Sequence, residues 1–223
     1  MKHLTSIVFF IIPLLSFSQV RNIVLEDKPI PKPYTVDTAI NHWNNEQADF
    51  IKLNKTAQDF YYWTNYSRVN PRRFWDSVVV PVLETFPNLK SSYSESLKTD
   101  LYNSPSLPML QLNPNLIFTA QSHASDIGLK KGAPGHISTD GRTFVDRIKA
   151  VGIKKCGGEN VSLGDVDPIL SLVLLYIDYG IQNLGHRKAL LNENYVETGV
   201  GVSKYGDEQD TLFIVQDFSC SQQ

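Results

Sequence analysis

The sequence lacks two features that would point to particular partners: an excess of basic residues and long apolar runs. Its 223 residues include 21 lysines and arginines against 23 aspartates and glutamates, a formal net charge of −2. Binding to nucleic acid or to an anionic membrane surface needs a concentration of basic charge. After residue 18, the longest apolar stretch (residues 170–177) is too short to cross a bilayer as a helix. We therefore predict no nucleic-acid partner and no transmembrane segment.

Internal repeats and low-complexity segments are also missing. The composition, with 42% hydrophobic and 20% charged residues, is ordinary for a globular protein. It excludes a disordered, collagenous or coiled-coil chain. The length favours one main domain, because most domains contain about 100–200 residues.

Residues 1–18 have the pattern of a secretory signal peptide. A short basic start is followed by an apolar run over residues 7–15, and Ser16 and Ser18 place small residues where signal peptidase inspects the chain. We expect cleavage before Gln19 and a secreted protein, extracellular or periplasmic. Residues 19–55 then form an N-terminal extension or linker with a possible helix, and residues 56–223 form the main domain.

Only two cysteines, Cys156 and Cys220, are present. Export to an oxidising compartment favours a disulfide between them. Closing so long a loop would stabilise the fold by roughly 4 kcal/mol in the chain-entropy model. The alternative is a pair of buried free thiols.

Helical patterns fill most of the chain, and strand patterns come at its end. Apolar spacing predicts helices near residues 56–70, 74–86, 91–102, 114–127, 144–151 and 166–179. Residues 199–202 and 211–220 have strand patterns and are joined by a polar turn. The second strand is apolar on both faces, which predicts a central strand covered by helices on each side.

Three short segments carry the candidate functional residues. They are GHISTDGR (135–142) with His136, CGGENV (156–161) with Glu159 in front of a strand-like stretch, and GHRKALL (185–191) with His186 at an expected helix start. Their glycines allow close approach of the backbone. Taken alone, each of these residues is more often a hydrogen-bonded structural residue than a ligand.

Taken in order, these segments resemble the CAP superfamily of cysteine-rich secretory, antigen 5 and pathogenesis-related 1 proteins, above all its bacterial branch of SCP-like extracellular proteins. Further matches are NYSRVNP (65–71), AQSHASD (120–126) and YVETGVGV (195–202). The resemblance covers residues 60–216. It implies an α/β fold, a three-layer α-β-α sandwich with a central, mainly antiparallel sheet.

The resemblance also implies a cleft with two histidines and two acids. By motif position, His136 and His186 match the histidines, which bind a divalent metal, often zinc, in many members. Glu159 matches the first acid. The second is a glutamate in a Trp-x-x-Glu segment of animal and plant members, where this chain offers Asp178 in YIDY (176–179) without the tryptophan.

A third histidine, His123, stands where other members carry an aromatic residue. We expect it to be a packed helix residue rather than a ligand. Asp126, about one helical turn further on, could satisfy its hydrogen bond.

Elementary chemistry limits what this cleft can do. Two neutral imidazoles can hold Zn²⁺ at roughly 2.0–2.1 Å, with waters completing the tetrahedron, but catalytic zinc sites normally use three protein ligands. We expect a loose, exchangeable zinc site whose affinity weakens below about pH 6, as protonation of the imidazoles competes with the metal. Glu159 could be a third ligand, orient an imidazole or act as a general base. A disulfide would silence Cys156, which leaves no activated nucleophile.

Three functions remain open. The favoured one is a secreted binding or interaction module whose cleft binds metal and, by resemblance, a sterol, a fatty acid or a cell-surface partner. The second is a metal-assisted, peptidase-like hydrolase with His136 and His186 on the metal and Glu159 as base. The third is a structural surface protein whose cleft residues only satisfy one another. Because fold does not imply function, we lean against an enzyme without excluding one.

Overall fold

The first half of the chain forms helices, and the sheet is built mainly from the second half. A computed structural model of the chain describes residues 25–26, 28–33, 36–165, 167–207 and 211–222. The predicted signal peptide, residues 1–18, lies outside the described residues and stays a prediction. None of the described helices combines the length and the apolarity that crossing a bilayer requires.

The helices begin and end close to where the sequence predicts them. Pro71, Pro114 and Pro168 each occupy the first turn of a helix, where a missing N–H costs nothing. The predicted helix over residues 74–86 contains a π-helical stretch, Trp75–Val79, between two α-helical pieces. The α-helices are α1 (Thr38–Glu46), α2 (Lys55–Val69), α3 (Pro71–Phe74), α4 (Val80–Thr85), α5 (Ser92–Asn103), α6 (Pro114–Lys130), α7 (Phe144–Ala150), α8 (Pro168–Ile177) and α9 (Gly185–Leu190).

The sheet has four described strands in the order β1-β3-β4-β2. Strand β1 (Gln111–Leu112) pairs in parallel with β3 (Glu197–Lys204), whereas β3–β4 and β2–β4 are antiparallel. Strand β4 (Thr211–Ser219) is central, as its two apolar faces predict. Strand β2 (Gly157–Asp165) forms one edge of the sheet.

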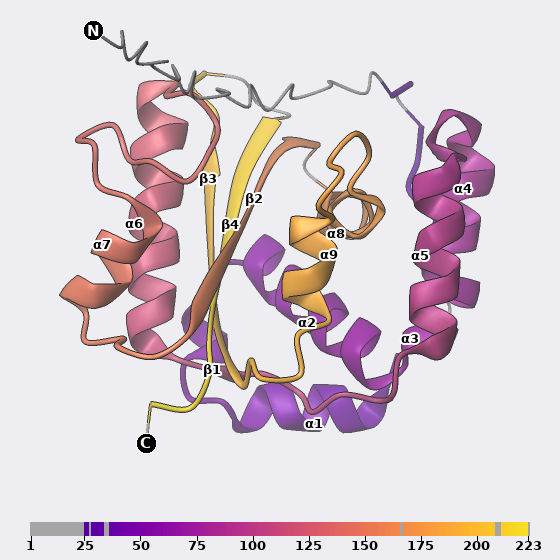
Figure 1. Cartoon of the computed structure of the whole chain (residues 1–223), viewed down its shortest axis with the longest axis horizontal. Helices are drawn as coiled ribbons and strands as arrows, with labels where there is room; N and C mark the ends of the chain where they lie inside the picture. Colours follow the sequence, from indigo (N-terminus) through magenta and orange to yellow (C-terminus); the bar gives the residue numbers. More distant parts are fainter. Residues whose placement is uncertain (1–24, 27, 34–35, 166, 208–210, 223) are drawn as a thin grey trace, which may run out of the picture.

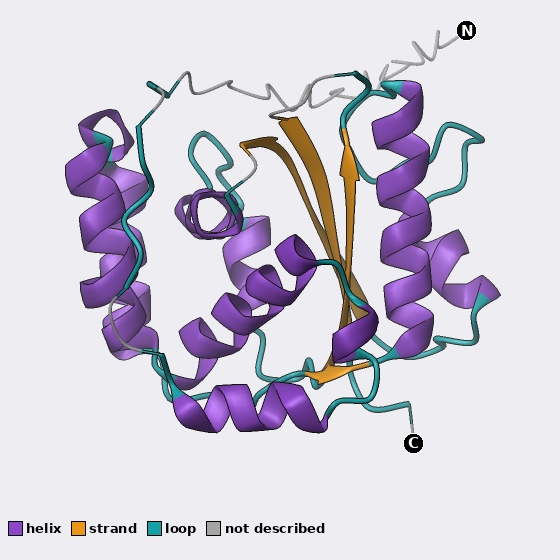
Figure 2. Cartoon of the chain, turned by 180° about the vertical axis from the view of Figure 1, so that it is seen from behind, coloured by secondary structure: helices purple, strands orange, loops and turns teal. Residues whose placement is uncertain are grey.

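Helices cover both faces of the sheet (Figure 1, Figure 2). Helix α6 lies along β3 and β4 on one face, with α7 beside it, and α2 and α8 pack on the other. Side chains along β4 point alternately to the two faces of the sheet. Phe213 and Val215 pack in the apolar cluster beneath α6, whereas Ile214 and Phe218 pack in the larger core on the opposite face. The predicted three-layer α-β-α sandwich is confirmed.

The predicted extension contributes to this larger core. Two of its side chains, Ile40 on α1 and Leu53 before α2, are buried there. The Trp43 indole N–H lies 3.1 Å from the carbonyl oxygen of Leu110, which attaches α1 to the segment that leads into β1. The boundary between residues 55 and 56 remains a prediction.

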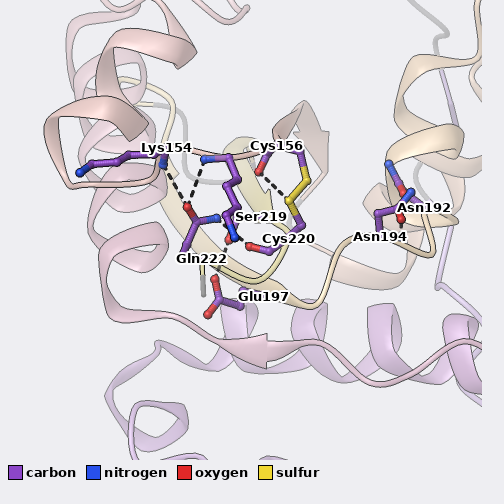
Figure 3. The surroundings of a disulfide bond; sticks show 9 residues. Lys154, Cys156, Asn192, Asn194, Glu197, Ser219, Cys220 and Gln222 are labelled. Atoms are coloured by element: carbon purple, nitrogen blue, oxygen red, sulfur yellow. Dashed lines mark hydrogen bonds between the residues drawn. A yellow bond between two sulfur atoms is a disulfide. The ribbon is translucent and has the colours of Figure 1, made fainter.

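The predicted disulfide between Cys156 and Cys220 is present, with the two Cα atoms 5.7 Å apart (Figure 3). Cys156 precedes β2 and Cys220 follows β4. The Cys220 N–H also donates to the Cys156 carbonyl oxygen at 3.4 Å. The disulfide therefore fastens the ends of β2 and β4 together, three residues before Glu159.

Candidate functional site

One cavity of about 880 Å³ brings three of the predicted cleft residues together: His136, Glu159 and His186 all line it. His136 lies in the loop between α6 and α7, on one side of the sheet, whereas His186 lies on α9, on the other. The cavity therefore lies at the β2 edge of the sheet, between the α6–α7 loop and α9. Asp178 does not line the cavity but is buried behind His186.

His136 is oriented by a buried carboxylate. Its Nδ1 lies 2.8 Å from Oε1 of Glu159, whose side chain is 1% exposed. A carboxylate only accepts hydrogen bonds when ionised, so Nδ1 carries a proton; in the neutral ring, Nε2 then keeps its lone pair. Oε2 of Glu159 accepts from Nη2 of Arg147. With both oxygens occupied, Glu159 has the geometry of an orienting residue.

His186 is held in the same way by Asp178. The distance from its Nδ1 to Oδ1 of Asp178 is 2.5 Å, and Oδ2 of Asp178 accepts from the Arg187 N–H at 3.0 Å. Asp178 ends α8 with φ of 55°, in the left-handed region that aspartate tolerates better than most residues. The shorter acid thus performs for His186 the role that Glu159 performs for His136.

Three buried arginines fix the chain segments around the cavity. Arg147 donates from Nη1 to the His136 carbonyl oxygen at 3.0 Å and to Ser138 Oγ at 3.1 Å, and so holds the loop of His136. Arg187 ties α9 to α8 and α5 through carbonyl oxygens and the carboxylate of Asp100. Arg68 donates to the carbonyl oxygens of residues 190, 192 and 195, at the end of α9 and in the segment after it.

The prediction that Asp126 satisfies His123 is wrong. Nε2 of His123 lies 2.8 Å from the Gly135 carbonyl oxygen and Nδ1 lies 3.2 Å from Ser138 Oγ. Asp126 instead accepts from the N–H of Thr139 at 2.6 Å and from Lys130. The loop folds back on α6 and offers closer partners than the helix itself does. His123 is nevertheless a buried, packed residue, as predicted.

These contacts form one continuous hydrogen-bond network behind His136. Because the Gly135 carbonyl only accepts, His123 donates from Nε2 and its Nδ1 accepts from the Ser138 hydroxyl, which in turn accepts from Arg147. Burial lowers the pKa of His123, which favours this neutral tautomer. The imidazole of His123 therefore fixes the loop on both sides of His136, at Gly135 and at Ser138.

Glu159 is ionised despite its burial. Burial alone raises the pKa of its carboxyl, but the hydrogen bond from His136 and the positive charge of Arg147 outweigh this effect and bring the pKa below its ordinary value. The site is thus a buried anion held between an imidazole and a guanidinium.

The model of the cysteine-rich secretory protein family, CAP, matches residues 66–218, which is more than half of the chain. The chain belongs to the CAP family. Comparison of the CAP chain with curated protein sequences found no significant match.

Two solved bacterial structures are similar to parts of this chain. An extracellular protein containing an SCP domain from Bacillus anthracis is 20% identical with a TM-score of 0.47, over 78% of this chain and 44% of that one. An outer surface protein from Borrelia burgdorferi is 21% identical with a TM-score of 0.41, over 58% of this chain and 90% of that one. The CAP chain thus spans less than half the length of the Bacillus protein.

Among the described residues, no group of three or more histidines, cysteines, aspartates and glutamates could together hold a metal ion. The CAP cleft offers two imidazoles, because Glu159 and Asp178 are occupied by their hydrogen bonds. Both carboxylates lie behind the histidines and hydrogen-bond to their Nδ1 atoms. Carboxylates in this position orient a metal-binding imidazole and raise its basicity.

Sequence inspection missed an aromatic residue of the CAP cleft, Tyr195. Its ring stacks on Phe218 with centroids 5.3 Å apart, and a Cβ added at Gly158 would lie 2.5 Å from its hydroxyl oxygen. The second glycine of GGEN therefore makes room for the tyrosine. The double glycine is the sequence signal that could have indicated a close neighbour at this position.

Sequence inspection also missed a further buried acid, Asp217, which lies behind Glu159. The two are cross-strand partners between β2 and β4, and Asp217 is fully buried. Its Oδ2 is 2.6 Å from Thr119 Oγ1, which is also 3.1 Å from the Leu116 carbonyl oxygen. Thr119 donates to Oδ2 of Asp217, but the hydrogen bond does not offset the cost of burying a second carboxyl beside Glu159. Burial and the Glu159 charge raise the pKa of Asp217 well above its usual range.

The Asp217→Asn variant is expected to gain stability relative to the wild type as pH rises from 5 to 7, by about 1–2 kcal/mol. An acid whose folded pKa is raised binds more protons in the folded state, so the wild type loses stability as pH rises above the unfolded pKa of about 3.8. Asparagine imitates the protonated acid and has no such loss. Urea unfolding at several pH values measures the difference.

Asp126→Asn is the matched control. The pKa of Asp126 is lowered to about 2 by hydrogen bonds from Lys130 and Thr139, which outweigh its burial. Its stabilisation is complete above the unfolded pKa and is lost only as pH falls through about 2, so this variant should cost the same at pH 5 and pH 7. A pH-independent difference for Asp217→Asn would contradict the raised pKa of Asp217.

Proposed function

We propose that this CAP protein is an exported binding module whose cleft holds a divalent metal ion, preferentially Zn²⁺, between His136 and His186. One observation carries the proposal: in both rings Nδ1 donates to a buried carboxylate, and both rings line the same cavity. This is the arrangement that leaves Nε2 available and orients it toward a metal. Imidazole nitrogen is a preferred ligand of zinc.

Two protein ligands make a weak, exchangeable site, in which water or a bound ligand completes the coordination. The role is therefore binding rather than permanent structural stabilisation. Apolar side chains beside the histidines, among them Val161, Leu163 and Ile181, support a ligand with apolar parts. A sterol or fatty acid fits this description by family resemblance.

Export is supported by two features of the chain. Residues 1–18 carry the pattern of a signal peptide, and the bond between Cys156 and Cys220 persists in oxidising compartments but is rare in a reducing cytosol.

The hydrolase alternative receives less support. A general base must have a free lone pair within reach of a water in the cavity. The Glu159 carboxylate has both oxygens engaged and its side chain is 1% exposed, and the Arg147 charge makes it a weaker base. The arrangement favours an orienting role for this residue.

Calorimetric titration of the mature protein with ZnCl₂ at pH 7.5 tests the proposal. We expect His136→Ala and His186→Ala each to weaken zinc binding at least 100-fold, and Asp178→Asn to weaken it about 10- to 100-fold through the orientation of His186. His42→Ala is the control, because the His42 side chain is 77% exposed on α1 and pairs with Glu46. Equal zinc affinity of the wild type and both cleft variants would refute the site.

A further inference from the structure

The cavity lies along the free edge of strand β2. It is lined by Glu159, Val161 and Leu163 of that strand, with His136 on one side and His186 on the other. Strand β2 pairs with β4 only, and no other strand of the described chain lies beside it. The floor of the cleft is therefore the unpaired side of a β-strand.

The register shows which backbone groups face the cavity. The Cys220 N–H donates to the Cys156 carbonyl oxygen, so this pair is of the hydrogen-bonded kind. Such pairs alternate along an antiparallel ladder, and the same register continues through Gly158↔Phe218 and Asn160↔Gln216. The even-numbered residues of β2 therefore bond to β4, and the N–H and C=O groups of Glu159, Val161 and Leu163 point away from β4.

Apart from the inward-pointing charge of Glu159, the β2 sequence carries few of the features that protect an edge strand. Natural edge strands are usually shielded by proline, lysine, a bulge or a covering element. Residues 157–165, GGENVSLGD, contain neither proline nor lysine, and all nine pair with β4 in an unbroken register. The Leu163 side chain is 39% exposed. Only the two walls of the cleft limit access to the strand.

The charge of the cleft selects among extended ligands. Its charged and titratable lining residues are His136, Glu159, His186 and Lys188, together with the phenol of Tyr195. The Glu159 charge is compensated by Arg147, whereas Lys188 is exposed on α9. The surface that a ligand meets is therefore apolar with a positive charge on the α9 wall.

We propose that the edge of β2 binds an extended peptide segment by strand addition, with apolar side chains in the cleft and an acidic residue facing Lys188. Main-chain hydrogen bonds to β2 supply affinity, and the pockets on the two walls read alternate side chains. Five extended residues span about 17 Å, which matches the five residues of β2 from Glu159 to Leu163. The proposal uses the same cleft as the proposed zinc site but does not require the metal.

Fluorescence anisotropy with a fluorescein-labelled peptide of sequence Val-Val-Glu-Val-Val tests strand addition. The titration is carried out on the mature protein in EDTA and repeated with ZnCl₂. We expect binding in both buffers, at least a tenfold loss when the alternate amides that face β2 are N-methylated, and little loss when the other set is methylated. Replacing the peptide's glutamate with lysine should weaken binding about fivefold or more.

Variants of the protein test the same contacts. Val161→Pro removes an N–H that faces the cavity but none that bonds to β4, so it should abolish peptide binding while circular dichroism stays unchanged. Lys188→Glu should weaken binding of the glutamate peptide and strengthen binding of the lysine peptide. Lys98→Glu on α5, outside the cleft lining, should change neither affinity.

Hydrogen exchange provides a readout that does not depend on folding of the variants. In the free protein, the amides of Val161 and Leu163 should exchange at least 100-fold faster than those of Asn160 and Ser162, and the peptide should slow them. Two results would overturn the proposal. One is that neither the glutamate nor the lysine peptide binds at 1 mM. The other is that the amides of Val161 and Leu163 exchange slowly because this edge pairs with a second copy of the chain. Zinc calorimetry reports separately on the metal site, so the two failures are distinguishable.

Discussion

Replacing Arg147 with methionine is expected to lower the free energy of unfolding by about 3–5 kcal/mol, because the Glu159 carboxylate is left buried without its cation. Both side chains are almost inaccessible, at 3% and 1% exposure. The pair is therefore little screened by water, and its removal also takes away the donors to His136 and Ser138. Urea unfolding of the mature protein at pH 7 measures the loss.

Arg142→Met is the control for this change. Arg142 lies in the same segment and pairs with Asp140, but both side chains are at least half exposed. Exposed ion pairs contribute about 0–1 kcal/mol, so this variant should remain close to the wild type. The contrast separates the effect of burial from the loss of a positive charge.

A second substitution distinguishes an unpaired charge from lost packing. In the Arg147→Met background, Glu159→Gln removes the uncompensated anion and should restore more than half of the lost stability. If Arg147→Met costs less than about 1 kcal/mol, or if the second change restores nothing, Arg147 does not hold Glu159 in the way described.

The expected effect on zinc is separate from the effect on stability. Loss of Arg147 frees the carbonyl of His136 and one oxygen of Glu159, so the imidazole is less well oriented. Changes to groups that orient a ligand typically cost 10- to 100-fold in metal affinity. Zinc titration of the folded Arg147→Met protein should therefore show a loss of this size, with Arg142→Met unchanged.

Much of the fold follows from local patterns in the sequence. The strand over residues 211–220 is apolar on both faces, which placed it at the centre of the sheet, and β4 is the central strand. Apolar spacing predicted a helix from about residue 114, and α6 begins at Pro114. These signals concern neighbouring residues, so each is complete within a few positions of the chain.

Strand β2 was harder to predict because its sequence has little strand propensity. Three of its nine residues are glycines and three more are Glu, Asn and Asp, all of which are depleted in strands. Its conformation depends on pairing with β4, some fifty residues further on, and on the bond between Cys156 and Cys220. Only the stretch after Glu159 had a recognisable strand pattern.

The layer behind the histidines was the least predictable part of the site. Arg147 lies on the short helix α7 and Asp178 at the end of α8, where a charged residue is ordinarily solvated. Their burial results from the meeting of distant segments, which no local spacing records. Asp217 was missed as well, although the sequence held a signal for it: a charged residue inside a strand with two apolar faces must be buried and therefore needs a partner.

Gly199→Ala is expected to destabilise the protein by about 4 kcal/mol or more, with a fall in melting temperature of about 10 °C. A Cβ at this position of β3 would lie 2.1 Å from the backbone N of Ile117 and the backbone C of Leu116. These atoms belong to α6 and cannot rotate aside, so the helix must move away from the sheet. Differential scanning calorimetry measures the shift.

Gly164→Ala is the matched control, because a Cβ added at this position of β2 meets nothing within 4 Å. It should change the unfolding free energy by less than about 1 kcal/mol, since only the conformational freedom of the backbone is altered. Helix α6 also carries His123, which fixes the loop of His136. Displacing it should weaken zinc binding together with stability. Wild-type stability of Gly199→Ala would contradict the direct contact between α6 and β3 on which the position of that loop depends.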